Sequence, residues 1–178
     1  FLKHLVDEAE KRGFNWKDYA VHILVGGEGM SEGLRDYLLQ YAKTVYSGYG
    51  ASDLEIGIAG ENPLTVMIRK LCLDDVSLRQ TLFGTDQRLP MLFQYNPADH
   101  LVEIVDKEIV VTISKPWTLS PRIRYNIKDE GGMITFDDMR ARLLRHNVDL
   151  LELERKCNYP RWYLPFLYVY KQKDNTIS

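Results

Sequence analysis

The succession of strand, glycine-rich loop, helix and strand near the start of the chain most constrains its fold. An apolar run over 20–25 has the length of a strand, and Gly26-Gly27-Glu28-Gly29 follows it at once. Ser31 is a good N-cap for a helix, and a second apolar run begins at Thr44. Strands joined through a helix in this way pair in parallel with a right-handed crossover. We therefore expect an α/β fold that contains a parallel βαβ unit.

The stretch over 46–55 combines several chemical groups that a binding site uses. It completes the second strand, and its two glycines begin a loop that we place at 47–53, because Gly reaches positive φ without steric cost. The stretch brings together an aromatic face, a hydroxyl and two carboxylates, on Tyr49, Ser52, Asp53 and Glu55. Such a set can hold a flat ring, a phosphate oxygen and a hard cation. The loop leaves the carboxyl end of a parallel strand, where open α/β sheets bind ligands.

The remainder of the first half is helical in pattern. Leu2, Leu5, Val6 and Ala9 share one face of a helix that Gly13 closes. A second helix begins at Asn62-Pro63, and a third covers 76–83. We expect these elements to form an α/β subdomain over 1–88.

From residue 89 the pattern changes to short β-rich runs. We expect strands at 91–95, 101–105, 108–114, 122–127 and 166–170. The turns between and after them are Asp106-Lys107, which reads as a tight hairpin turn, and Asp129-Glu130-Gly131-Gly132. Two helices follow, one capped by Thr135 and one over 149–157. The sequence therefore predicts a second, β-rich and distorted barrel-like lobe with two helices over 89–178.

Composition narrows the function classes. The chain has 178 residues, 45% of them hydrophobic, and a net charge of −2, so no basic field recruits nucleic acid or an anionic membrane. No apolar run approaches the roughly 20 residues of a membrane span, and no signal peptide is visible. Cys72 and Cys157 form no C-x-x-C pair and indicate a reducing, cytoplasmic setting, with a disulfide between them left open. We read the chain as a piece of a longer protein.

Two common signatures nearly match the central stretch and fail. Gly48-x-Gly50 lacks the third glycine of a dinucleotide fingerprint, since Asp53 holds that place. Gly50-x-Ser52 lacks the closing glycine of a nucleophile elbow, because Leu54 stands there. A Rossmann dinucleotide site and a hydrolase triad are therefore disfavoured.

Four segments in order resemble the adenylate-forming enzymes, and most closely their phenylacetate-CoA ligase branch. They are Gly26-Gly27-Glu28-Gly29, Tyr49-Gly50-Ala51-Ser52-Asp53, Arg124-Tyr125-Asn126-Ile127-Lys128-Asp129, and Phe166–Tyr170 followed by Asp174-Asn175-Thr176. The resemblance covers about residues 20–178. It implies that the chain is the later part of the large N-terminal domain, with the family's phosphate loop upstream and its C-terminal domain downstream.

The resemblance also implies a role for each matching residue. Gly27, Glu28 and Gly29 would line the adenine edge, and Tyr49, with Gly50 beside it, would lie against the adenine face. Ser52 would donate to the α-phosphate, and Asp53 would bind Mg²⁺, with Glu55 as a substitute ligand; Ser52 and Asp53 are thus the catalytic candidates. Asp129 would accept from the ribose hydroxyls, and Asp174 would mark the interdomain hinge. Tyr49 and Asp129 should then open into one cleft.

The implied reaction of the full-length enzyme joins a carboxylic acid to ATP. It yields acyl-AMP and pyrophosphate, with Mg²⁺ as the metal, and then a thioester on coenzyme A. The partner is a small-molecule carboxylic acid, with no nucleic acid or membrane involved and a homodimer left open. This fragment by itself would be inactive.

The sequence departs from the family pattern at three positions and leaves alternatives open. Asp53 stands where the family usually has Glu, Gln172 takes the place of the hinge arginine, and Lys128 stands where many relatives have Gly or Arg. One alternative is a nucleotide-binding or interaction domain that keeps the fold without catalysis. The other is an enzyme that transfers the acyl group to a protein thiol.

Overall fold

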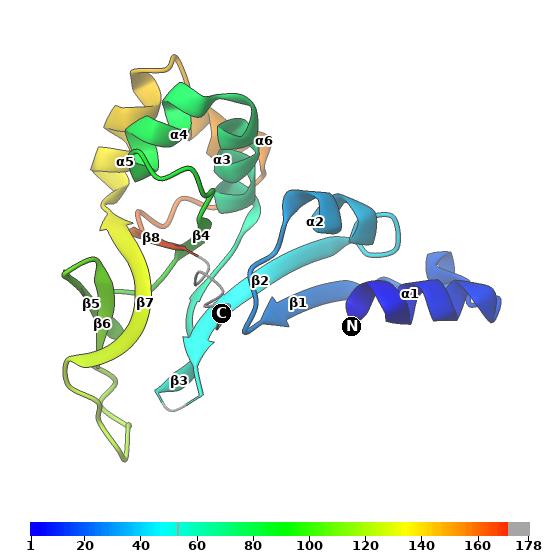
Figure 1. The fold of residues 1–178 in the computed structure, drawn as a ribbon, viewed down its shortest axis with the longest axis horizontal. Helices are drawn as coiled ribbons and strands as arrows, with labels where there is room; N and C mark the ends of the chain where they lie inside the picture. Colours follow the sequence, from blue (N-terminus) through cyan, green and yellow to red (C-terminus); the bar gives the residue numbers. More distant parts are fainter. Residues whose placement is uncertain (53, 171–178) are drawn as a thin grey trace, which may run out of the picture.

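The computed structural model describes residues 1–52 and 54–170. This part of the chain has a mixed α/β fold built on one eight-stranded, mostly antiparallel sheet (Figure 1). The strands lie in the order β1-β2-β3-β4-β8-β7-β6-β5. They are β1 (His22–Gly26), β2 (Thr44–Ala51), β3 (Glu55–Gly60), β4 (Met91–Gln94), β5 (His100–Val105), β6 (Glu108–Ile113), β7 (Tyr125–Ile134) and β8 (Phe166–Val169).

Six α-helices and one 3-10 turn accompany the sheet in these two ranges. They are α1 (Leu2–Lys11), η1 (Trp16–Asp18), α2 (Glu32–Leu38), α3 (Pro63–Asp74), α4 (Val76–Phe83), α5 (Phe136–Leu144) and α6 (Leu150–Lys156). Helices α3 to α6 gather at one end of the molecule, whereas α2 lies along β1 and β2 (Figure 1). Among the described helices, none combines the length and apolarity needed to cross a bilayer.

The predicted βαβ unit is confirmed. Strand β1 pairs in parallel with β2, from His22 opposite Thr44 to Gly26 opposite Gly48. Helix α2 connects them, and the Ser31 hydroxyl accepts from the backbone N–H of Leu34. The side chain satisfies one of the donors that a helix leaves unpaired at its start, which is why the helix begins there.

Other predicted helix starts are also confirmed. The Asn62 side chain accepts from the backbone N–H groups of Leu64 and Thr65 at the start of α3. The Thr135 hydroxyl accepts from the backbone N–H of Asp138 at the start of α5. These contacts are local in sequence, so a capping pattern predicts them without knowledge of the tertiary structure.

Two expectations about strand ends are wrong. Strand β2 continues to Ala51 and forms a hairpin with β3, so its glycines lie within a strand and not in a loop over 47–53. Strand β7 runs through 129–132, which we expected to be a turn. In both places ladder hydrogen bonds to a neighbouring strand outweigh the low strand propensity of glycine.

Strands β3 and β4 pair at a single position among the described residues, with Gly60 opposite Gln94. The Asn62 side chain reinforces this point, because its Nδ2 donates to Gln94 Oε1 at 2.9 Å. The pair joins β1, β2 and β3 to the other five strands. We call this junction the β3–β4 seam.

Buried apolar side chains form two separate clusters. The first packs α1 and α2 against the sheet and includes Val6, Leu38, Val45, Tyr49, Phe93, Ile109 and Leu167. The second lies among α3 to α6 and includes Leu64, Ile68, Leu82, Leu92, Met139, Leu143 and Phe166. The first cluster forms one wall of the candidate site.

A buried ionic network links α2, α3 and the end of β3. It consists of Glu32, Arg35, Glu61 and Arg69, whose side chains are all at most 4% exposed. Arg35 Nη2 donates to both carboxylate oxygens of Glu61, at 2.7 and 2.8 Å. Arg69 donates to Glu32, and the backbone N–H of Ser47 donates to Glu61 at 2.8 Å. Two carboxylates and two guanidinium groups therefore balance their charges away from water.

The predicted hairpin turn between β5 and β6 is confirmed and carries a first testable prediction. Asp106 and Lys107 have φ values of 52° and 69°, in the left-handed region that costs a non-Gly residue about 1–2 kcal/mol. Two-residue hairpin turns of this kind favour Gly at the second position. We expect Lys107→Gly to raise the free energy of unfolding by about 1 kcal/mol, measured by urea denaturation. Lys107→Ala removes the same charge and keeps a Cβ, so an equal gain there would contradict the backbone explanation.

Candidate functional site

An open cleft of about 560 Å³ lies where the β1–α2 loop meets the middle of the sheet. Its size falls in the range of about 300–1,000 Å³ typical of small-molecule sites. The β1–α2 loop, β2, β4, β7 and the end of β8 all contribute to it. The lining residues are Gly27, Glu28, Gly29, Gly48, Tyr49, Gly50, Met91, Phe93, Asp129, Val169 and Tyr170.

Six of the residues predicted as nucleotide contacts line this one cleft: Gly27, Glu28, Gly29, Tyr49, Gly50 and Asp129. They come from three segments that are separated in sequence by up to about a hundred residues. The expectation that Tyr49 and Asp129 open into a common cleft is confirmed. Which ligand these residues bind stays a prediction.

The β1–α2 loop forms the exposed rim of the cleft. Gly27 has a φ of 81°, and an added Cβ there would strain the backbone although no atom lies within 4 Å of it. Glu28 is exposed beside it. The loop thus presents backbone atoms and one carboxylate to a ligand, with little side-chain bulk.

Tyr49 projects from β2 into the wall of the cleft. The side chain is 8% exposed and stacks on Phe93 of β4, with ring centroids 5.6 Å apart and an interplanar angle of 27°. Its hydroxyl donates to Asp129 Oδ2 at 2.9 Å. Burial, and then the neighbouring Asp129 carboxylate, raises the pKa of Tyr49 well above its usual value, so the hydroxyl stays a donor.

Asp129 reaches the cleft because β7 is bulged. Glu108 pairs with Glu130 and Val110 pairs with Asn126, so Ile109 of β6 alone stands opposite residues 127–129 of β7. Lys128, in the middle of the bulge, has a φ of 70°. Bulges of this kind bend a strand and redirect its side chains, and they are frequent beside functional sites.

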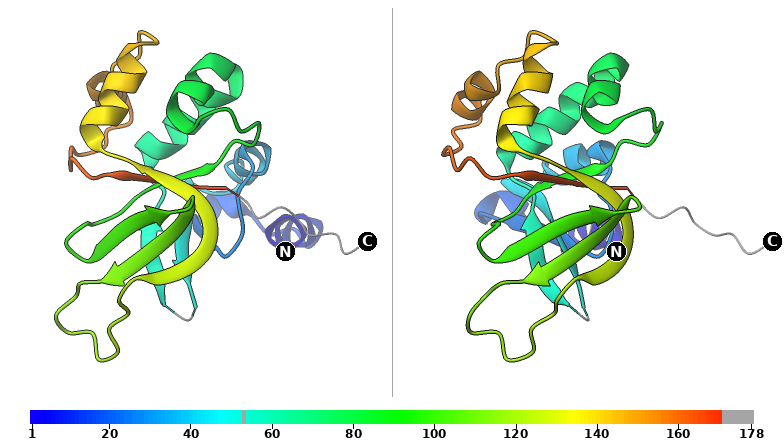
Figure 2. Two further views of the ribbon diagram at one scale, coloured as in Figure 1. Left: turned by 60° about the vertical axis from the view of Figure 1, so that its left-hand side comes forward. Right: turned by 90° about the vertical axis from the view of Figure 1, so that its left-hand side faces the viewer.

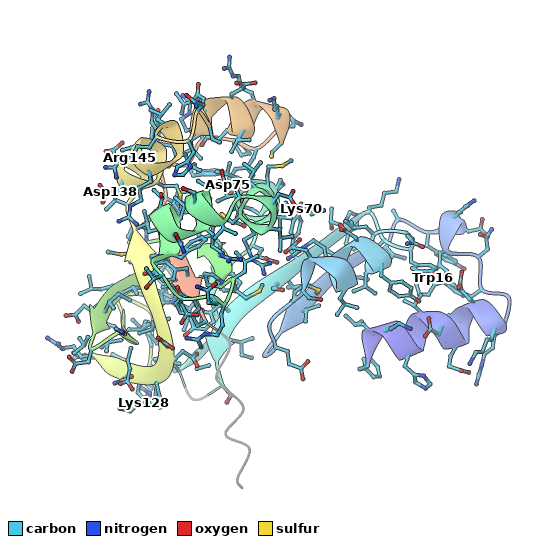
Figure 3. All side chains as sticks on the ribbon, turned by 45° about the horizontal axis from the view of Figure 1, so that its top comes forward. Trp16, Lys70, Asp75, Lys128, Asp138 and Arg145 are labelled. Atoms are coloured by element: carbon cyan, nitrogen blue, oxygen red, sulfur yellow. The ribbon has the colours of Figure 1, made fainter. Side chains whose placement is uncertain are left out.

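The strong curvature of β7 closes the cleft on its other side. Figure 2 shows β7 as a broad curved ribbon in both views, and Figure 3 places Lys128 at its bend. Three strands separate β2 from β7 in the sheet order, so a flat sheet would keep Tyr49 far from Asp129. The curvature therefore brings the two side chains into contact.

Tyr170 ends the cleft wall beyond β8. Its hydroxyl donates to the carbonyl of Phe83 at 2.8 Å, and its backbone N–H donates to the carbonyl of Glu130 at 2.8 Å. The Arg88 guanidinium lies 4.6 Å from the centre of the Tyr170 ring. Burial raises the pKa of Tyr170 to about 12. The residue is thus held at its backbone, at its hydroxyl and on one face of its ring, and it forms a wall of the cleft.

The described residues that line the cleft carry a net negative charge. Glu28 and Asp129 are the ionisable carboxylates in its lining, and no Lys or Arg of the described ranges belongs to it. Arg88 lies outside the lining, over the Tyr170 ring, and is paired with Asp86 and Glu130, at 2.7 and 2.6 Å. The lining favours hydroxyl or amine donors and flat rings over phosphate oxygens.

The remaining predicted site residues lie elsewhere. Ser52 is exposed in the turn after β2 and does not line the cleft. Glu55 begins β3, with its backbone opposite Ala51. Asp53 and Asp174 lie outside the described residues. Within the described residues, no group of three or more His, Cys, Asp and Glu side chains could hold a metal ion, and a Mg²⁺ site at Asp53 and Glu55 stays a prediction.

Four apolar or aromatic lining residues were not predicted: Met91, Phe93, Val169 and Tyr170. All four lie on or just after β4 and β8, which pair with each other, Met91 opposite Val169. The sequence did predict both strands. It carries no signal that pairs segments 75 residues apart along the chain, and so their approach to the cleft could not be foreseen.

Comparison with family models, with curated proteins and with solved structures finds no significant match to this chain.

Proposed function

We propose that the cleft binds the nucleoside part of ATP and of an acyl adenylate, and that the chain is part of the large domain of an enzyme that activates a carboxylic acid. The observation that carries the proposal is the convergence of Gly27–Gly29, Tyr49 and Asp129 in one cleft. The sequence resemblance requires that convergence, and β2 and β7 are not neighbours in the sheet.

The backbone of the bulge supports the same proposal. Lys128 adopts a φ of 70° at the position where the resemblance has Gly or Arg in many relatives. A left-handed conformation is where Gly carries no steric cost, so the bulge gives a physical reason for Gly there. The family pattern at Arg124–Asp129 therefore fits the local geometry of this chain as well as its sequence.

The residues of the cleft divide the task of holding a nucleoside. The base would enter between the β1–α2 loop and the wall formed by Tyr49, with the exposed backbone of Gly27 and Gly29 at its edge. Asp129 would accept from the ribose hydroxyls, because a carboxylate is an acceptor with several lone pairs. Met91 and Val169 would exclude water from the far side.

The chemistry beyond nucleoside binding depends on groups outside the described cleft. The described lining supplies no cation for a triphosphate, and Asp53 remains the residue that would hold Mg²⁺. When bound, Mg²⁺ would stabilise charge on the phosphate oxygens. Coenzyme A stays part of the proposal for the full-length enzyme only.

Asp129→Ala tests the assignment directly. We expect the variant to lose about 1–3 kcal/mol of AMP binding free energy, the scale of a hydrogen bond to a charged group, in a calorimetric or NMR titration of the full chain. Asp138→Ala removes a carboxylate from α5, outside the cleft, and should bind AMP as the parent does. Equal AMP binding by Asp129→Ala and the parent, with both folded, would exclude Asp129 from the site.

The negative lining supports a second candidate, a nucleoside-binding domain of the same fold without adenylating activity. Phosphate binding normally uses Arg, Lys or helix N-termini, and the described lining presents Glu28 and Asp129. Pyrophosphate exchange by the full-length protein distinguishes the two candidates. ATP-dependent exchange on addition of carboxylic acids supports the enzyme, and nucleoside binding without exchange supports the non-catalytic domain.

A further inference from the structure

Arg69 of α3 lies outside the lining of the cleft and bonds to two of the segments that form it. Its Nε donates to the carbonyl of Pro90 at 2.9 Å, and its Nη2 donates to the carbonyl of Met30 at 3.3 Å. Pro90 directly precedes Met91 of β4, and Met30 directly follows Gly29 of the β1–α2 loop. Gly29 and Met91 both line the cleft. One guanidinium therefore ties two walls of the cleft together from behind.

The β1–α2 loop and β4 are close neighbours with little backbone pairing to hold them so. A Cβ added at Gly29 would lie 3.9 Å from Met91 Cγ, an ordinary van der Waals distance. The loop follows β1, on one side of the β3–β4 seam, and β4 lies on the other side. In the described chain a single ladder pair joins β3 to β4. A side-chain link between the loop and β4 therefore has a large share in fixing their separation.

The chemistry of arginine suits this link. Arg69 Nη1 also donates to Glu32 and, at 3.4 Å, to Glu61, and the side chain is 4% exposed. Buried carbonyls need donors, and the planar guanidinium has five N–H groups, so one residue serves two carbonyls and two carboxylates. A lysine ammonium is a compact donor on a flexible stem and does not span the four acceptors.

We propose that Arg69 is a positioning residue for the cleft, which bonds the carbonyls of Met30 and Pro90 and so holds Gly27–Gly29 against β4 before a ligand arrives. A loop that is already ordered loses little entropy on binding, and this favours affinity. The effect on affinity rests on the proposed nucleoside site, whereas the effect on the loop is independent of the ligand. The two effects therefore have separate measurements.

Arg69→Lys tests the proposal, because it keeps the charge of the buried network and removes the fork. In the free chain, backbone order parameters from NMR relaxation at Glu28, Gly29 and Met30 should fall from the rigid range of about 0.85 toward about 0.6. Saturating AMP should return them to the parental values. AMP affinity, measured by calorimetric titration of the full chain, should fall about tenfold, because binding then has to order the loop.

Arg35→Lys is the matched control, since it makes the same change in the same buried network. Arg35 is 1% exposed and pairs with Glu32 and Glu61. The carbonyl that it contacts is that of Val45, inside β2, where the ladder with β1 also holds the backbone. Its loss of unfolding free energy should be comparable. The order parameters of the loop should stay parental, and AMP affinity should stay within about twofold of the parent.

Several results would overturn the role of Arg69. One is an Arg69→Lys variant with a rigid loop and parental AMP affinity, and another is a looser loop with parental affinity. A third is an equal loss of affinity in Arg69→Lys and Arg35→Lys without a change confined to the loop, which indicates a purely structural role.

A second variant serves if Arg69→Lys does not fold. Arg69→Gln combined with Glu32→Gln removes one cation and one anion and leaves the pair of Arg35 with Glu61 intact. The same loosening of the loop is expected, and a rigid loop would again overturn the role. A parent chain that binds no AMP overturns the proposed function, whereas the order parameters of the free chain still decide the role of Arg69.

Discussion

Replacing Glu61 by Gln is expected to lower the free energy of unfolding by about 3–5 kcal/mol. Glu61 accepts two bonds from Arg35 and one from the backbone of Ser47, and its side chain is fully buried. Without its charge, Arg35 and Arg69 share the single carboxylate of Glu32. A net positive charge is then left in a region that water does not reach, and that is the main cost.

The pair between Asp36 and Lys70 is the matched control, because it joins the same two helices, α2 and α3, at the surface. The two groups lie 2.6 Å apart with side chains 60% and 37% exposed. Asp36→Asn should cost no more than about 1 kcal/mol. Urea denaturation at constant m-value measures both variants. Equal losses for Glu61→Gln and Asp36→Asn would show that burial adds nothing to this network.

A further double substitution separates charge from packing. Arg35→Met combined with Glu61→Met removes one cation and one anion, so no net charge is left behind. The double variant should be destabilised by clearly less than the sum of the two single variants, since each single variant leaves the other charge unpaired. Simple additivity would contradict the ionic explanation.

Gly131→Ala is expected to be the second severe change, with a loss of about 3 kcal/mol or more, at or beyond the upper end of the overpacking range. A Cβ at this position would lie 2.3 Å from the carbonyl oxygen of Tyr168 and 2.8 Å from Ile109 Cδ1. The oxygen belongs to the paired strand β8, where Gly131 stands opposite Val169. Relief of the clash therefore requires β7 and β8 to separate.

Gly33→Ala makes the same chemical change in α2, where an added Cβ meets no atom within 4 Å. Alanine is favoured over glycine inside a helix by about 0.5–1 kcal/mol, so this variant should be slightly more stable than the parent. Thermal and urea denaturation of both variants give the comparison. A Gly131→Ala protein as stable as Gly33→Ala would mean that β7 and β8 pack less closely than described.

What the sequence predicts correctly is mostly local. The predicted helix starts are defined by local contacts. Each capping side chain, on Ser31, Asn62 and Thr135, accepts from a backbone N–H two or three positions ahead. The turn at 106–107 is likewise settled by its two flanking strands. These features need no information about distant parts of the chain.

What the sequence does not predict depends on non-local pairing. The segment 129–132 has the composition of a turn, and its pairing with β6 at Glu130 and with β8 from Gly131 onward makes it a strand. Strand β3 contains two glycines and was not predicted at all, since it is stabilised by pairing with β2. Ser52 was predicted as a phosphate contact from the family resemblance, and it lies in the turn after β2, outside the lining of the cleft.

The candidate site shows the same division. Short segments around Gly27, Tyr49 and Asp129 carry recognisable chemistry, and the prediction that the last two share a cleft is confirmed. The apolar wall from β4 and β8 follows from the order of strands in the sheet. Hydrophobic strands of this kind are compatible with many sheet orders, so their sequence does not specify a place beside the cleft.

The β3–β4 seam divides the lining of the cleft between two groups of strands. Gly27 and Tyr49 stand on one side of the seam, and Asp129 and Tyr170 stand on the other, yet only Gly60 and Gln94 join the two strand groups by a ladder pair in the described chain. The contacts of Tyr49 with Phe93 and with Asp129 cross that boundary close to the ladder pair, since Gly48 stands opposite Gly60. Side-chain contacts, those of Tyr49 among them, and not a backbone ladder, therefore hold the two walls of the cleft together.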